Sequence, residues 1–172
     1  MANSSVIEFI SKLQMLQAGQ LTILRGHRNQ ALDASLAGFD LFTALWWPLR
    51  EKNKFAPRKE VSWLIAKSYA ARPMPQLDGA LMPDLLGRLY HEAAEDKRKQ
   101  IIDLNDRLLN LSIRQLEPCL DHNLALIQKR YNCLDWAWLL DKLSVWESLS
   151  TREQWAELFI NAKYKTREVN HD

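Results

Sequence analysis

Residues 134–146 read LDWAWLLDKLSVW, in which large apolar side chains recur at spacings of three and four. Side chains spaced in this way share one face of an α-helix, which has about 3.6 residues per turn. The residues on this face are Trp136, Leu139, Leu140, Leu143 and Trp146. Asp135 directly precedes them, and Asp is a residue type that caps the first turn of a helix. The stretch therefore predicts a helix that begins near residue 136 and is buried along one side.

Helical spacing of apolar residues extends over most of the chain, and over residues 36–47 it places Phe39, Phe42, Leu45 and Trp46 on one apolar face. It predicts further helices over about residues 6–18, 36–47, 57–71, 85–90, 96–111, 116–127 and 151–159. Gly19 and Pro48 are expected to end the first two, Gln20–Arg28 to lie between helices, and Thr151 to cap the last. No segment of four to eight residues alternates as a half-buried strand does. The prediction is an all-α fold of two small packed helical bundles, with no β-sheet.

The break between the bundles is expected at residues 72–83, which read RPMPQLDGALMP. Three prolines and a glycine are too many for the interior of a helix and are typical of a crossover segment. This predicts an N-terminal helical bundle with basic loops over residues 1–76 and a C-terminal bundle over 77–172. The boundary is expected to fall within residues 72–95.

Composition limits the classes of protein to consider. The chain has 172 residues, of which 47% are hydrophobic and 26% charged, as is typical of a soluble globular protein. No run of about 20 apolar residues predicts a membrane helix, and the first residues lack the pattern of a secretory signal. We expect a cytoplasmic protein without membrane contact. The two cysteines, Cys119 and Cys133, lie in apolar surroundings that suit reduced thiols.

Two groups of residues partly resemble metal sites. Residues 91–95 read HEAAE, which has Glu95 where a zinc-protease helix needs its second histidine. Cys119, His122 and Cys133 could supply three zinc ligands, but no fourth ligand or base accompanies them, and packing is the favoured interpretation. No nucleotide-binding loop or nucleophile motif occurs. We therefore expect a protein that is not an enzyme and has no metal or cofactor.

Positive charge is concentrated in the first half of the chain. Residues 1–76 contain ten Lys or Arg against five Asp or Glu, whereas residues 77–172 contain 13 against 16. The first basic group is Arg25 and Arg28. The second basic group comprises Arg50, Lys52, Lys54, Arg58 and Lys59. Placed in loops and at helix ends, these groups could contact a nucleic-acid backbone, serve solubility or meet an acidic partner protein.

Other charged and aromatic residues leave alternatives open. The run Lys97–Lys99 follows Glu95 and Asp96, so ion pairing within the helix explains it equally well. Most of the seven tryptophans lie on the predicted buried faces. Trp47 is the exception, because two adjacent rings at 46 and 47 cannot both face one core, and it is a candidate for stacking on a base.

A more specific pattern occurs in the second half of the chain. It consists of RLLN at 107–110, LDWAWLLDKL at 134–143, Trp146, and WAELF at 155–159. This order and spacing resemble the CasB family, the small subunit of the type I-E CRISPR complex called Cascade. Three shorter stretches are also similar to that family: GQLTILR at 19–25, Pro57-Arg58, and LGRL at 86–89.

The resemblance implies a non-catalytic, all-helical subunit of a CRISPR RNA-guided surveillance complex that serves antiviral defence. Such subunits occur as a pair of copies, contact other Cascade subunits, lie near the CRISPR RNA and the target DNA strand, and help to hold the displaced non-target strand of the R-loop. The alternative is a helical protein–protein adaptor without direct nucleic-acid contact.

The resemblance also implies which residues bind nucleic acid. Motif positions carry over to Arg25, Arg58, Arg88, Arg107 and Arg152, and charge alone adds Arg28, Lys52, Lys54 and Lys59. Arg88 and Arg107 could instead be structural. Gly26 stands where the family has a second arginine, so either Arg28 makes that contact or the site is weaker.

Overall fold

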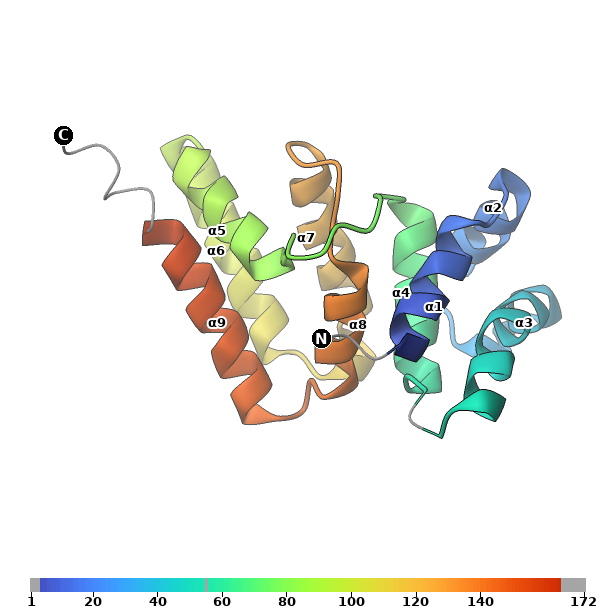
Figure 1. Ribbon diagram of the computed structural model, residues 1–172. Helices are drawn as coiled ribbons and strands as arrows, with labels where there is room; N and C mark the ends of the chain where they lie inside the picture. The colour runs from blue at the N-terminus through green and yellow to red at the C-terminus, as the bar shows by residue number, and fades with distance from the viewer. Residues whose placement is uncertain (1–3, 55, 165–172) are drawn as a thin grey trace. The chain divides into compact units, whose positions relative to one another are not determined.

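In the computed structural model, which describes residues 4–54 and 56–164, the stretch quoted first forms helix α8 (Trp136–Ser144) and the turn after it (Figure 1). The side chains of Trp136, Leu139 and Leu143 are fully buried, and Trp146, just beyond the helix end, is only 1% exposed. Asp135 precedes the helix as predicted. Its Oδ2 accepts a hydrogen bond from the backbone N–H of Gly79 at 2.8 Å, so the carboxylate holds a turn that is distant in sequence.

Every regular element in the described part of the chain is helical. In chain order these are α1 (Ser4–Gln14), α2 (Ala18–Gly26), the short 3-10 helix η1 (Leu32–Ala34), α3 (Leu36–Lys52), α4 (Lys59–Ala71), α5 (Met82–Glu92), α6 (Glu95–Asn110), the 3-10 helix η2 (Ile113–Gln115), α7 (Glu117–Gln128), α8 and α9 (Leu149–Tyr164). No β-sheet occurs in residues 4–54 or 56–164, so the predicted all-α fold is confirmed.

These helices form two compact units. Unit 1 contains α1 to α4 together with α8, and unit 2 contains α5, α6, α7 and α9. The sequence-based division into 1–76 and 77–172 assigned residues 136–144 to the C-terminal bundle, but α8 packs on α1 and α4. That division assumed that each bundle is continuous in sequence, whereas the apolar face of α8 is buried against helices that lie more than 60 residues earlier.

The core of unit 1 is aromatic. The ring of Phe42 lies between Trp46 and Trp63, with centroid distances of 6.2 and 5.5 Å, and it contacts the edge of Phe9 at 6.3 Å. Trp136 of α8 packs edge-on against Tyr69 of α4. Each such pair contributes roughly 0.5–1.5 kcal/mol beyond its buried area. The aromatic pairs therefore stabilise the contacts among α1, α3, α4 and α8.

Unit 2 is a bundle in which α5 and α9 lie side by side (Figure 1). Trp146 and Trp155 pack edge to face at 5.3 Å. Both indole N–H groups have partners, Leu111 O at 3.0 Å and the buried Asn105 Oδ1 at 3.1 Å. The polar atoms of these buried rings therefore carry little desolvation cost.

The tryptophan prediction is confirmed. Trp46, Trp63, Trp136, Trp146 and Trp155 are at most 8% exposed, whereas Trp47 is 51% exposed. The indole N–H of Trp47 donates to Glu51 Oε1 one helical turn later at 2.8 Å. Its ring therefore lies on the surface of α3.

Four local predictions are wrong. Gln20–Arg28 does not lie between helices, because Ala18–Gly26 form α2. Gly19 does not end a helix but lies inside α2, and residues 15–17 make the break, with the Gln17 N–H bonded to Gln20 Oε1. Pro48 does not end α3, which continues to Lys52 and buries the next residue, Leu49, to 1% exposure. Thr151 lies inside α9, which begins two residues earlier.

The close approach of α5 to α9 depends on Gly87. A Cβ at this position would lie 2.5 Å from the backbone oxygen of Phe159 and 2.7 Å from the Cβ of Ala162. We expect Gly87→Ala to lower the free energy of unfolding by about 1–3 kcal/mol, because the two helices must move apart. Urea unfolding followed by circular dichroism measures this loss.

Gly19→Ala is the matched control. Nothing lies within 4 Å of a Cβ added there, and alanine favours the helix by up to about 1 kcal/mol over glycine. The control should be neutral or stabilising. Equal effects of the two substitutions would contradict the close packing of α5 and α9.

Candidate nucleic-acid interface

The first basic group lies at the end of α2. Arg25, in the last turn of this helix, is exposed, and its Nε donates to the backbone oxygen of Ala70 near the end of α4 at 3.0 Å. Arg28 is exposed in the turn that follows, and Asn29 next to it has a φ of +60°. Asn is one of the few residue types that tolerate this left-handed conformation. The turn therefore directs the chain back toward η1 with Arg28 at its tip.

Two side chains of α4 fix this turn. The backbone oxygen of Gln30 accepts hydrogen bonds from Trp63 Nε1 at 3.0 Å and from Lys67 Nζ at 2.9 Å. Lys67 is only 3% exposed, and its ammonium lies 5.1 Å from the centroid of the Trp63 ring. A buried ammonium needs such partners because its desolvation is costly. Lys67 thus holds the backbone that carries Arg28, a structural role that the sequence did not indicate.

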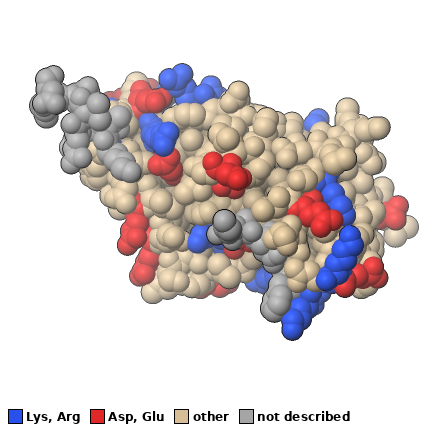
Figure 2. All heavy atoms as spheres, viewed as in Figure 1, with Lys and Arg blue, Asp and Glu red and all other residues tan. Residues whose placement is uncertain are grey.

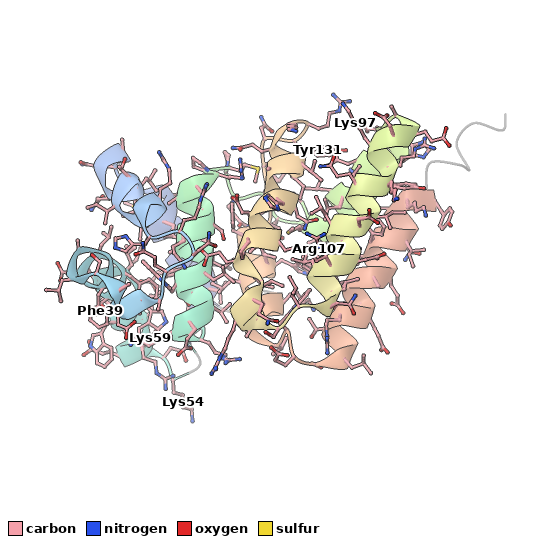
Figure 3. The ribbon with its side chains drawn as sticks, turned by 180° about the vertical axis from the view of Figure 1, so that it is seen from behind. Phe39, Lys54, Lys59, Lys97, Arg107 and Tyr131 are labelled. Atoms are coloured by element: carbon pink, nitrogen blue, oxygen red, sulfur yellow. The ribbon has the colours of Figure 1, made fainter. Side chains whose placement is uncertain are left out.

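The second basic group spans the end of α3, the following loop and the start of α4. Lys52, Lys54 and Arg58 are exposed, and Lys59 is half-buried. Figure 2 shows Lys and Arg side chains gathered at the lower right of the drawn face, where Figure 1 places the end of α3. Figure 3 labels Lys54 and Lys59 in the same region. Loop and helix-end positions leave these cations accessible to phosphates.

Buried contacts fix the loop of the second group. Trp46 Nε1 donates to the backbone oxygen of Pro57 at 2.8 Å, and Asn53 Nδ2 donates to Ser5 Oγ at 2.8 Å. The guanidinium of Arg50 donates to the backbone oxygen of Lys54. Arg58 also makes a long hydrogen bond of 3.4 Å to the backbone oxygen of Ser144. These contacts therefore hold Asn53 and Pro57, which lie beside the basic residues of the loop.

Arg25 and Lys59 meet α4 near its opposite ends. Arg25 bonds to Ala70 in the last turn, whereas Lys59 is the first residue of the helix. At a rise of 1.5 Å per residue, these points are roughly 16 Å apart. The turn that carries Arg28 bonds through Gln30 to Trp63 and Lys67, so it meets α4 between these two points. Such spacing suits an extended ligand better than a single small anion.

The three candidate arginines of unit 2 are not gathered together. Arg88 on α5 forms an ion pair of 2.8 Å with Asp84 one turn earlier. Arg107 on α6 is exposed and lines a shallow groove with Lys99, Asp96 and Asp103, so two carboxylates balance the two cations (Figure 3). Arg152 on α9 is half-buried, and its Nε has no hydrogen-bond partner within the described residues. An ion pair, nearby carboxylates or partial burial therefore makes each of these three arginines less available to a phosphate than the exposed basic residues of unit 1.

Arg98 has a structural role instead of the ion pairing that the sequence left open. Its Nε donates to the backbone oxygens of Tyr90 and Ala93, and its Nη2 donates to that of His91. These carbonyls lie at the end of α5, where a helix has unsatisfied acceptors. Arg98 therefore caps α5.

Neither group that resembles a metal site is assembled as one. Within residues 4–54 and 56–164, no cluster of three or more His, Cys, Asp or Glu side chains could hold a metal ion. Burial raises the pKa of the Cys119 thiol, against smaller opposing effects of Arg107 and Asn123. A protonated thiol is a poor ligand and a poor nucleophile. Among the described helices, none combines the length and the apolar character that a membrane crossing requires.

The raised pKa of Cys119 predicts a difference in reactivity. At pH 8 we expect iodoacetamide to modify the partly exposed Cys133 well before the buried Cys119, and to modify both once urea unfolds the chain. Mass spectrometry of the peptides measures the two rates. Equal rates in the folded protein would contradict the burial of Cys119.

The raised pKa of Cys119 also determines how the free energy of unfolding changes with pH. The unfolded chain releases the Cys119 proton near the ordinary value of 9.0, before the folded chain does. The stability that comes from burying the protonated Cys119 thiol is therefore complete below pH 9. It is lost as pH rises through the pKa of Cys119 in the folded chain. Urea unfolding at pH 8 and pH 10 measures the loss, which should be smaller in Cys119→Ala.

Phe39 is a surface residue that sequence analysis misplaced. Its spacing from Phe42 and Trp46 predicts a buried ring, but Phe39 is 37% exposed, while Phe42 is fully buried. The ammonium of Lys59 lies 5.4 Å from the centroid of the Phe39 ring. The proximity of Phe39 to the basic Lys59 could have been found only from the pairing of α3 with α4.

No protein-family model matches the chain, and no curated protein sequence matches it. The fold, however, is that of three solved structures. They are CasB from M. ruber (TM-score 0.76, 17% identity, covering 97% of this chain and 98% of that one), a CRISPR-associated protein of the Cse2 family from Thermus thermophilus (0.68, 19%, 94% and 99%), and a structure described as CasB from Thermus thermophilus (0.64, 21%, 91% and 96%).

Proposed function

We propose that this chain is a CasB-type small subunit of a cytoplasmic CRISPR RNA-guided surveillance complex. It catalyses no reaction, binds the backbones of the nucleic-acid strands, stabilises the R-loop and its displaced strand, and bridges other subunits, together with a second copy of itself. The observation that carries the proposal is the match of nearly the whole chain to solved CasB structures. The CasB-like motifs of the sequence support it independently, because they were identified without the fold.

The charge of unit 1 agrees with binding to a phosphate backbone. The basic excess of the first 76 residues includes the exposed Arg25, Arg28, Lys52, Lys54 and Arg58. Ala70, which bonds to Arg25, and Lys59, which follows Arg58, are about 16 Å apart along α4. Lysine and arginine side chains contact phosphates without reading sequence. An extended strand could therefore contact both groups while guide pairing supplies specificity.

Energetics explain why such modest contacts are sufficient. Opening a target duplex replaces DNA pairs by RNA–DNA pairs of similar stability, so the exchange is nearly balanced. A subunit that binds the displaced strand even weakly shifts this balance toward the open state. The proposed role thus needs several salt-sensitive contacts but no catalytic group.

Charge removal tests the proposal. We expect the triple variant Arg25→Ala, Arg28→Ala, Arg58→Ala to bind a random single strand more weakly than the original chain. Each lost phosphate contact lowers the slope of log affinity against log salt by about 0.7, so the slope should fall by about 2. Fluorescence anisotropy at several salt concentrations measures both quantities.

A second triple variant removes the same charge elsewhere. Lys97, Lys99 and Arg114 are exposed basic residues of unit 2, and their replacement by alanine should change affinity much less. Circular dichroism must show that both variants remain folded. Equal losses in the two variants would point to net charge alone, and no loss in either would reject the proposed contacts.

A protein–protein adaptor is the second candidate function. Leu36 and Leu149 are 88% and 66% exposed, which would suit contact with a partner. If the adaptor is correct, the original chain should show no mobility shift with a random single strand, while the arginine variant should fail to join an acidic partner subunit.

The proposed role also predicts an effect in the assembled complex. With the partner subunits, guide RNA and a target duplex, the arginine variant should shorten the lifetime of the open duplex. Permanganate reactivity of thymines in the displaced strand reports this lifetime. An unchanged lifetime in a fully assembled complex would contradict the stabilisation of the R-loop.

A further inference from the structure

Unit 1 contains a hollow of about 370 Å³ beside the second basic group. It lies between η1, the start of α3 and the start of α4, and its lining includes Leu32, Asp33, Phe39, Lys59, Glu60 and Trp63. This volume lies within the range of sites that take small organic groups.

The walls of the hollow are suited to a flat ring. Phe39 exposes 37% of its surface, whereas Trp63 is 4% exposed and its N–H is already bonded to Gln30. Figure 3 shows the side chains of Phe39 and Lys59 near each other, consistent with the 5.4 Å between the ammonium and the ring centroid. Aromatic side chains of this kind stack on nucleobases of any identity.

Charge argues against a phosphate inside the hollow. Its lining carries one ammonium, on Lys59, and two carboxylates, on Asp33 and Glu60. Ionised carboxylates accept hydrogen bonds and repel phosphate. They favour a group with N–H donors, such as the exocyclic amino group of cytosine, adenine or guanine. A nucleobase therefore suits the interior, while the phosphates attached to it must stay outside.

The neighbouring residues supply a place for those phosphates. Arg58 is exposed and directly precedes Lys59 at the start of α4. A strand whose phosphates contact Arg58 and the outer side of Lys59 would have a base within reach of the hollow. An apolar side chain of a partner protein could also enter, but it would leave both carboxylates unused.

The geometry points to a nucleobase pocket: the hollow takes one amino-bearing base of a bound single strand, stacked on Phe39 and bonded to Asp33 or Glu60. This inference rests on the proposed function, since it adds a base contact to a strand that is held by its phosphates. It makes binding depend on the bases and not on charge alone.

The experiment compares oligonucleotides with and without bases. A ten-residue deoxycytidine strand and an abasic strand of the same length carry the same phosphates. We expect Phe39→Ala to weaken binding of the deoxycytidine strand roughly 5- to 100-fold and to leave binding of the abasic strand unchanged. Leu36→Ala, on the same helix and 88% exposed, is the matched control and should change neither. Phe39→Tyr, which keeps an aromatic ring, should bind the deoxycytidine strand as tightly as the original chain does.

A third strand tests the carboxylates. Thymine lacks the amino group, so the deoxycytidine strand should bind more tightly than a thymidine strand, and Asp33→Ala together with Glu60→Gln should remove the difference. Equal affinity of the original chain for both strands would overturn the assignment of an amino-bearing base.

The outcomes separate this inference from the proposed function. If Phe39→Ala binds the deoxycytidine strand as the original chain does, while the arginine triple variant still loses affinity, the pocket is rejected and the phosphate contacts stand. If the original chain binds no single strand at all, both are rejected. A Phe39→Ala variant that binds strands normally but fails to assemble with partner subunits would show that a protein side chain fills the hollow.

Discussion

The organisation of unit 1 follows from the burial of α4. Ten consecutive residues of this helix, Val61–Ala70, are buried, including Lys67 and two serines. A helix buried on all sides needs neighbours all round it, and α2, α3 and α8 provide them. Only the ends of α4 approach solvent. Arg25 and Lys59 meet α4 near these two ends, so their separation is a consequence of the packing.

Side chains of α3 and α4 also hold the segments that carry basic residues. The turn with Arg28 is fixed by hydrogen bonds from two α4 side chains to Gln30, and the loop before Arg58 is fixed by the indole of Trp46. A basic side chain on a fixed backbone loses less conformational entropy on binding than one on a mobile loop. Rigid placement thus compensates for the small number of cations.

Amphipathic helices were the most predictable part of the fold. Helix α8 could be predicted from Trp136, Leu139 and Leu143, because their spacing of three and four fits one face of a helix and not a strand. Gly19 and Pro48 misled the prediction, since their local preferences were overridden by the packing of α2 and α3. The pairing of α8 with α1 and α4 had no local signal at all. The resemblance to CasB indicated the correct fold, which the chain shares with solved CasB structures at only 17–21% identity.

Charge in the sequence located the basic groups but not their surroundings. Arg25 and Arg58 were identified as exposed cations, whereas the capping of α5 by Arg98 depends on how α5 and α6 meet. Phe39 was assigned to the core because it shares a spacing with Phe42, and a rotation of α3 by a fraction of a turn decides which ring is buried. Sequence spacing does not resolve such a rotation. The hollow beside Phe39 could therefore not be predicted from the sequence.

The late position of α8 in the chain has a consequence for biosynthesis. Unit 1 is interrupted by residues 77–135 and is complete only with Trp136–Ser144. The first four helices therefore emerge from the ribosome long before α8, which covers one side of α4. During that interval the aromatic core near Tyr69 lacks the Trp136 ring, and unit 2 begins to fold while unit 1 is still open. Synthesis at about 5–20 residues per second makes this a delay of several seconds, during which a chaperone could recognise the uncovered face.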